Sequence, residues 1–181
     1  MATIIRNGLK SKNVHLRPTT SDDVELFFKW RESADPQSRE LMIRPIKPIG
    51  YWQEEYKHTA ANPEVFDLTL ARNKDEGIIA RVTVTDLNLL NRSCRLGLAS
   101  DPELKKRAEL DEGVSTLAGY LFRQYNLNSI YGAVTALDRT YIETLEALGF
   151  KRDGALRQRH FFDGEYHDVL VFSLLRYEAE V

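Results

Sequence analysis

The sequence predicts an α/β (α+β) domain spanning residues 1–181, in which helices cover both faces of a mixed, mostly antiparallel sheet of about seven strands. Hydrophobic residues alternate in about seven short segments, as in strands with one buried face. In other segments they recur three and four apart, as in amphipathic helices. A strand–helix–strand succession in the middle of the chain predicts one parallel pair, with the helix as its crossover.

The composition sets limits on function. Hydrophobic residues make up 43% and charged residues 29% of the 181, which is ordinary for a globular protein and excludes a disordered chain or a membrane bundle. The formal net charge of −2 argues against nucleic acid as a partner. No apolar run approaches a membrane span and no signal-peptide core is present, so we expect a cytoplasmic protein without a membrane partner. No cluster of metal-ligand residues is seen, so no metal is expected.

The N-terminal elements follow from local patterns. A strand is predicted over 14–19, and Thr20 to Asp23 matches a capping box that opens a helix to about residue 33. A loop rich in proline and arginine covers 35–48. A second helix is predicted over 49–61, with Pro48 at its first position.

The middle and C-terminal elements complete the order. Three alternating segments predict consecutive antiparallel strands: 66–70, 80–84 and 94–98. A charged stretch over 103–112 leads into a helix over 114–125, and a strand over 130–135 follows. The next helix covers 139–148 and ends at Gly149. A hairpin turning at Asp163-Gly164 joins strands over 155–162 and 166–175.

The single cysteine, Cys94, is interpreted as a buried strand residue, because Leu96 and Leu98 continue the same alternation. A catalytic thiol is the alternative.

Three stretches carry a family resemblance. The first is VHLRP at 14–18 with KWR at 29–31, and the second is RLGLASDPE at 95–103. The third is the ordered series LEALGF at 145–150, GALR at 154–157, DGEYHD at 163–168 and LLRYE at 174–178. In order and spacing they resemble the GNAT superfamily of N-acetyltransferases, and most closely its ribosomal-protein N-terminal acetyltransferase branch, over roughly residues 13–178.

The resemblance implies a V-shaped splay between the fourth and fifth strands that holds acetyl-CoA as co-substrate, without a metal. The pantetheine would pair with backbone along Gly97, Leu98 and Ala99. The pyrophosphate would lie at the N-terminus of the next helix, where free N–H groups and a partial positive charge favour an anion.

The pyrophosphate loop departs from the family pattern Arg/Gln-x-x-Gly-x-Gly/Ala, because only Ala108 of the matching stretch, 103–108, fits it. Lys105, Lys106 and Arg107 could bind phosphate through their side chains instead. The alternative is a solvated charge run on a protein that no longer binds CoA. Asp138 stands where the family often has asparagine and could bond to the cofactor arm.

Candidate catalytic residues are also displaced from the family positions. Leu145 occupies the position of the family's acid tyrosine, and Tyr141 one turn earlier could replace it or be a partly buried packing residue. Arg95 stands near the place of the family's base glutamate and stays protonated. Asp86 could act as base through a water, or cap the turn to Asn91.

The resemblance implies that the first two helices and their loop cover the acceptor side, where aromatic and basic residues could form a pocket: Trp30, Arg31, Arg44, Trp52 and Tyr56. Core packing is the alternative for Trp52 and Tyr56. Arg39 and Arg44 hint at an anionic group on the acceptor. His160 and His167 fall on facing hairpin strands, where they could line this site or be exposed.

These observations predict an N-acetyltransferase that moves an acetyl group from acetyl-CoA to a primary amine by direct attack. The amine could be a protein N-terminus, an amino sugar or a small amine. The alternative is an inactive GNAT-fold interaction module. A homodimer is possible.

Overall fold

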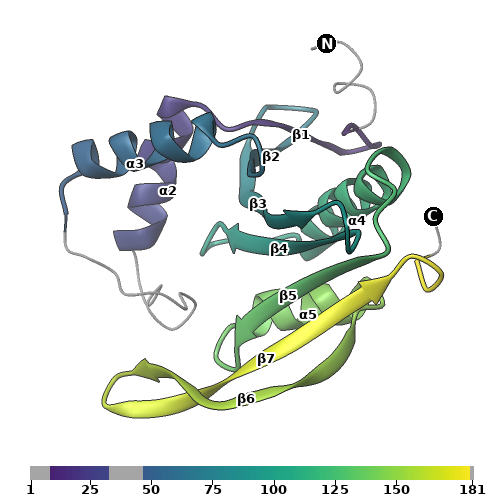
Figure 1. The fold of residues 1–181 in the computed structure, drawn as a ribbon. Helices are drawn as coiled ribbons and strands as arrows, with labels where there is room; N and C mark the ends of the chain where they lie inside the picture. Colours follow the sequence, from purple (N-terminus) through teal and green to yellow (C-terminus); the bar gives the residue numbers. More distant parts are fainter. Residues whose placement is uncertain (1–8, 33–46, 180–181) are drawn as a thin grey trace.

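The computed structural model describes residues 9–32 and 47–179 and contains a seven-stranded sheet with the order β1-β2-β3-β4-β5-β7-β6 (Figure 1). Neighbouring strands are antiparallel except for the parallel pair β4–β5. The predicted mixed, mostly antiparallel fold is confirmed. The elements in chain order are β1 (Val14–Pro18), α2 (Ser21–Glu32), α3 (Ile49–Ala61), β2 (Phe66–Arg72), β3 (Ile78–Asn88), β4 (Ser93–Ser100), α4 (Arg107–Gln124), β5 (Ser129–Thr135), α5 (Arg139–Ala147), β6 (Lys151–Phe162) and β7 (Glu165–Leu175).

Helices cover both faces of the sheet, as predicted. One face packs against α4 and α5, whose apolar side chains form the core with the even-numbered residues of β1 to β4. The approach is close at Gly113 of α4, where a Cβ atom would lie 2.4 Å from Cδ1 of Leu70. The other face is partly covered by α2 and α3, which lie side by side away from α4 and α5 (Figure 1).

The start of α4 differs from the prediction, and the burial of α3 decides an alternative that the sequence left open for Trp52 and Tyr56. α4 begins at Arg107, seven residues earlier than predicted, because the buried side chain of Leu110 extends the apolar stripe by one turn. No side chain of α3 is fully buried, so α3 is an outer helix rather than a core helix. Pro48 lies one position before the first helical residue and is the N-cap of α3.

Both predicted C-terminal turn signals are confirmed. Gly149 follows α5 with a φ of +80°, a conformation that glycine adopts without strain. Asp163 and Gly164 both have positive φ values, 48° and 81°, as a tight turn between antiparallel strands requires.

A buried carboxylate, that of Asp23, fixes α2 to the sheet. Its two oxygens accept hydrogen bonds from the Arg17 guanidinium at 2.5 and 2.8 Å. One of them also accepts from the backbone N–H of Thr20 at 2.8 Å and from the hydroxyl of Thr69 at 3.0 Å. The bond to Thr20 is the predicted capping contact, and Thr69 lies in the middle of β2, where the strand is buried on both faces.

The pKa of Asp23 reflects two opposing effects. Burial raises it, but hydrogen bonds from Arg17 and Thr20 outweigh burial and lower the pKa to about 2. The ionised carboxylate is therefore the form that the fold stabilises.

We expect Asp23→Asn to lower the free energy of unfolding by about 3 kcal/mol at pH 7, because a buried ion pair loses one partner. Since folding lowers the pKa of Asp23, its contribution is complete above the ordinary pKa of 3.8 and is lost as the pH falls through about 2. Urea denaturation between pH 7 and pH 2 measures both effects. Asp22→Asn, in the same turn but exposed, is the control, and a stability difference that persists unchanged to pH 2 would contradict the assignment.

Candidate active site

The parallel pairing of β4 and β5 ends after three residue pairs, of which the last is Arg95 with Tyr131. Beyond this point β4 continues to Ser100 and β5 to Thr135, and neither strand has the other as a partner. The two strands diverge toward their C-terminal ends (Figure 1). The V-shaped splay predicted between the fourth and fifth strands is therefore present.

The hydrogen-bonding direction of β4 decides which residues present backbone to this gap. The N–H of Asp101 donates to the carbonyl of Ile79 on β3 at 2.9 Å. Since bonding direction alternates along an antiparallel strand, Gly97 and Ala99 also direct their backbone groups toward β3. Only one of the three predicted pantetheine-binding residues, Leu98, is thus oriented toward the gap.

The even-numbered residues of β4 face the gap with their backbone groups. The Leu96 carbonyl accepts a hydrogen bond from α5 across it, and the N–H and C=O of Leu98 lie one period further along. Ser100 follows by the same alternation. Leu96 and Ser100 were not among the residues that the sequence analysis placed at the gap. The two-residue period of the strand, counted from Leu98, would have identified them.

Tyr141 of α5 occupies the narrow end of the splay. Its hydroxyl donates to the Leu96 carbonyl at 2.5 Å, and the side chain is buried. Gly132 of β5 makes room for it, because a Cβ atom there would lie 3.1 Å from the hydroxyl oxygen. Burial, and to a lesser extent nearby Asp138, raise the pKa of Tyr141, while Arg95 opposes the rise. The hydroxyl therefore stays protonated at neutral pH.

The wide end of the splay leads to the start of α4. Lys106 is the N-cap, and the first turn-closing bond runs from the N–H of Glu109 to the Lys106 carbonyl at 3.2 Å. The N–H groups of Arg107 and Ala108 precede that bond and are free of the helical pattern. This is the anion-favouring arrangement expected from the sequence.

The three basic residues at this helix start are not equivalent. Arg107 is paired with Glu143 of α5 and lies 3.5 Å from Asp111. Lys106 has only a long contact of 3.8 Å with Glu109. Lys105 is exposed and pairs with no acid in the described part of the chain. Lys105 and Lys106 are thus the cations available to a phosphate.

Asp138 caps a helix. Its carboxylate accepts from the N–H of Tyr141 at 3.0 Å and is buried at the start of α5. This bond helps to set the direction of the Tyr141 side chain toward the splay.

Asp86 lies in β3, next to Tyr131 of the last β4–β5 residue pair. It has a φ of 53° in an irregular part of β3, and it accepts a hydrogen bond from the Tyr131 hydroxyl at 3.1 Å. The turn to Asn91 is capped by Asn88 instead, whose side chain accepts from the Asn91 N–H at 2.7 Å. Asp86 is therefore exposed beside the last β4–β5 pair rather than used as the turn cap.

The candidate acceptor residues are only partly described. Trp30 is half-buried on α2 with its ring centroid 5.3 Å from that of Phe27, and Trp52 is half-buried on α3 with its ring 5.2 Å from that of Tyr51. The Tyr56 hydroxyl donates to the Thr19 carbonyl, so this side chain anchors α3 to the end of β1. Arg44, Arg39 and the side chain of Arg31 lie outside the described residues.

His160 differs from the exposed hairpin histidine that sequence patterns favour. It is 8% exposed, and its Nε2 atom is buried without a hydrogen-bond partner. No sequence signal distinguished it from His167, which is half-buried on the facing strand.

Within residues 9–32 and 47–179, no group of histidine, cysteine or acidic side chains could hold a metal ion. None of the helices in these ranges combines the length and apolar character that crossing a bilayer requires.

In the described residues, the one parallel pair of a mixed sheet opens over a helix N-terminus, and this fold is shared with solved acetyltransferases. No protein-family model matches the chain. Curated proteins do match it, and two of them align over most of the chain. The "Putative ribosomal N-acetyltransferase YdaF" of Bacillus subtilis is 23% identical over 155 residues, 86% of this chain and 78% of the relative. The spermidine N(1)-acetyltransferase of Vibrio cholerae is 24% identical over 138 residues, 71% of this chain and 80% of the relative.

Among solved structures, the Vibrio cholerae spermidine N-acetyltransferase in complex with CoA and spermine superposes with a TM-score of 0.81 and 19% identity, covering 91% of this chain and 96% of that one. The resemblance predicted from sequence is confirmed: the curated relatives are N-acetyltransferases, and the chain has the fold of GNAT acetyltransferases. The ribosomal branch is not singled out, because a spermidine enzyme matches about as well. The relatives support acetyl transfer from acetyl-CoA as the reaction class.

Cys94 is the buried strand residue that the alternation predicted. It is fully buried, and burial raises the pKa of its thiol to about 12. At neutral pH almost none of it is the reactive thiolate.

We expect a thiol-specific disulfide reagent at pH 7.5 to modify Cys94 at least about a hundredfold more slowly in the folded protein than in urea. The rate is followed by absorbance of the released thiol, with urea-unfolded protein as control. Equal rates would mean that Cys94 is accessible and would reopen the catalytic-thiol interpretation.

Proposed function

We propose that the protein transfers the acetyl group of acetyl-CoA to a primary amine, and that the amine approaches from the sheet face bearing α2 and α3. The observation that carries this proposal is the outward-facing backbone of Leu98 in a splay that opens at the start of α4. Acetyl-CoA, when bound, supplies the thioester carbonyl that the amine attacks.

Leu98 is the backbone group best placed for pantetheine. Its N–H and C=O lie beyond the last β4–β5 pair, so an extended amide chain can take the position that a further residue of β5 would occupy. The core side chain of Leu96 and the close Gly97–Thr83 contact hold β4 in place at this point.

Phosphate binding at α4 combines backbone and side-chain donors. The N–H groups of Arg107 and Ala108 supply the helix N-terminus, and Lys105 and Lys106 supply mobile positive charge. Arg107 is held by Asp111 and Glu143, so we assign it to the α4–α5 contact rather than to the phosphate. Asp138 acts on the cofactor site through its cap of α5.

Two side chains at the narrow end of the splay suit the chemistry. Asp86, exposed beside Tyr131, can take the proton of the attacking amine through a water. The raised pKa of Tyr141 makes it a poor proton source. Its hydroxyl carries one proton, which the Leu96 carbonyl accepts, so we assign Tyr141 to exchange this partner and donate to the negative charge that develops on sulfur as the C–S bond breaks.

The acceptor remains open within the class of primary amines: a protein N-terminus, an amino sugar or a small amine. The relatives' names cover a ribosomal and a spermidine acetyltransferase. Trp30 and Trp52 offer aromatic surface at this face. A homodimer and a cytoplasmic location stay predictions. One structural neighbour, the Vibrio cholerae spermidine enzyme, is a dodecamer.

We expect Lys105→Ala with Lys106→Ala to weaken acetyl-CoA binding by about tenfold or more, because two charges near the phosphates are removed. Calorimetric titration of the wild type and the double variant with acetyl-CoA and with CoA measures this. Arg107→Ala is the matched control and should change the affinity much less.

A wild-type protein that binds neither compound at millimolar concentration would overturn the proposal. That outcome would favour the inactive interaction module, for which the altered pyrophosphate loop is the specific observation.

We expect Tyr141→Phe to lower kcat by about a hundredfold while the Kd for acetyl-CoA changes little, because a donor to transition-state charge is lost. Steady-state acetylation of an accepted amine, with calorimetry for the Kd, gives both numbers. Tyr125→Phe removes a half-buried hydroxyl at the far end of α4 and should leave kcat unchanged. An unchanged kcat in Tyr141→Phe would assign this side chain to packing alone.

A further inference from the structure

The β6–β7 hairpin extends past the end of β5 toward the open side of the splay. The pairing of β5 with β7 ends at Thr135 and Val169, whereas β7 begins at Glu165. The hairpin therefore adds surface beyond the C-terminal end of β5, where the gap between β4 and β5 is widest (Figure 1).

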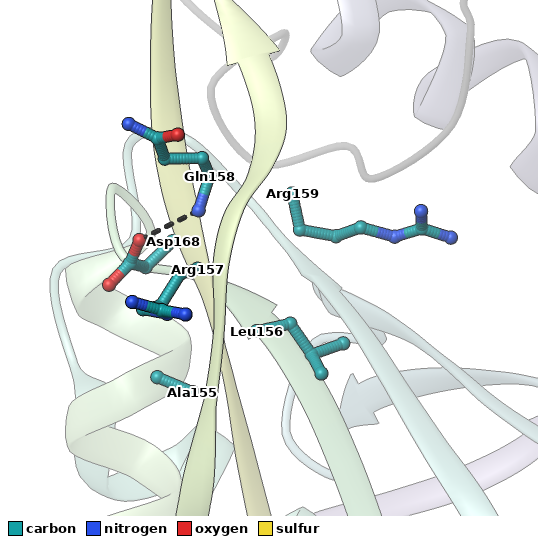
Figure 2. Close-up of a pocket in the computed structure, with 6 residues that line it drawn as sticks. All are labelled: Ala155, Leu156, Arg157, Gln158, Arg159 and Asp168. Atoms are coloured by element: carbon teal, nitrogen blue, oxygen red, sulfur yellow. Dashed lines mark hydrogen bonds between the residues drawn. The ribbon is translucent and has the colours of Figure 1, made fainter.

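A register shift in β6 determines which side of the hairpin each neighbouring side chain occupies. Three residues, 157–159, stand opposite Asp168 alone, because the register shifts between Leu156 and His160. The N–H of Gln158, whose φ is 50°, donates to the Asp168 carboxylate at 2.9 Å. Figure 2 shows Asp168, Gln158 and Arg157 on one side of β6 and Arg159 extending from the other. These residues, with Ala155 and Leu156, line an open groove of about 1040 Å³.

The strand register identifies the side that faces the acceptor. Gly132 of β5 faces Tyr141 and α5, so Thr135, three residues on, faces the opposite side of the sheet. Val169 pairs with Thr135 and with Leu156, and these residues share that face. Leu156 and Arg159 lie together on it in Figure 2.

His160 belongs to the same face. It pairs with His167, which is two residues from Val169 on β7 and so points the same way. Its ring stacks on Phe162 with an interplanar angle of 5°. Its Nε2 atom is buried and unpartnered, and a buried polar atom without a partner costs free energy unless a ligand or water satisfies it.

The charge on this face is positive. Arg159 is exposed and has no acid within ion-pair distance in the described part of the chain. Asp168 faces the other side and is bound to Gln158, and the first acid on the face of His167 is Glu165 at the turn. A polyamine would need carboxylates here, whereas a guanidinium fork suits a carboxylate or a phosphate.

We propose that Arg159 and His160 bind an anionic group of the acceptor, so that the protein prefers amines carrying a carboxylate or a phosphate to polyamines. This specificity rests on the proposed acetyl transfer and names the acceptor class for it. Arg159 supplies the charge at the surface, and the unpartnered Nε2 of the buried His160 supplies one directed hydrogen bond to an anion that displaces the side chains covering it.

The test compares matched acceptors with the full-length protein. Glucosamine 6-phosphate against glucosamine is the phosphate arm, Ala-Asp-Glu against Ala-Lys-Lys is the carboxylate arm, and spermidine is the polyamine. We expect kcat/KM at least about tenfold higher for the anionic member of one pair or both, through a lower KM. The arm that responds identifies the anion. Spermidine outperforming every anionic amine would overturn the proposal.

Paired variants locate the effect. Arg159→Gln should abolish the preference for the anionic acceptor. Arg157→Gln removes the same charge from the other side of β6 and should preserve the preference. Equal losses in the two variants would mean that general surface charge, and not this site, attracts the anion.

A binding measurement separates this proposal from the acetyl transfer on which it rests. The imidazole NMR signals of His160, assigned with His160→Gln, should shift on titration with the anionic acceptor and not with spermidine, whether or not turnover occurs. Unchanged signals in a protein that binds acetyl-CoA would refute the site alone. Failure to bind acetyl-CoA would refute the transferase function instead.

Discussion

The early end of the β4–β5 ladder is the constraint on which the rest of the structure depends. Continued pairing beyond Arg95 and Tyr131 would close the splay and satisfy the Leu98 backbone within the sheet. Instead the strands part, and a hydroxyl from α5 takes over the carbonyl of Leu96. β4 thus stays paired with β3, and β5 with β7, while the edge of β4 that faces the gap is left without a strand partner.

The two faces of the sheet carry different kinds of stabilisation around that gap. The α4–α5 face is apolar and close-packed, as the Gly113–Leu70 approach shows. The α2 face is fixed by a polar contact, in which the Asp23 carboxylate joins Arg17, Thr20 and Thr69. This network contributes to holding α2 to the sheet, and the Tyr56 hydroxyl bond to Thr19 does the same for α3, which has no fully buried side chain.

The order of elements could be predicted because periodicity is local. Alternation at Cys94, Leu96 and Leu98 and the stripe along α4 gave the strand and helix positions, and Gly149 and Gly164 gave their ends. The start of α4 was predicted too late, because Leu110 is surrounded in sequence by charged residues and was not recognised as part of the apolar stripe.

The site was less predictable because its properties depend on contacts between distant segments. The capping of the turn by Asn88 rather than Asp86 depends on an irregularity in β3. The pairing of Arg107 with Glu143 depends on how α4 meets α5. The burial of His160 depends on a register shift that no residue pattern in the hairpin announces.

The edges of the sheet have a consequence for how copies of the protein can meet. One edge, β1, is only five residues long, ends at Pro18, and has a short stretch around Lys10 lying against it. The other edge, β6, is long but irregular, and Arg152, Arg157 and Arg159 give it positive charge, whereas Lys151 is paired with Glu178. Two copies of β6 placed side by side would bring these charges together, which disfavours strand addition at this edge. Contact between copies is therefore favoured at other surfaces, such as the exposed rings of Phe161 and Tyr166, over extension of the sheet from one molecule into the next.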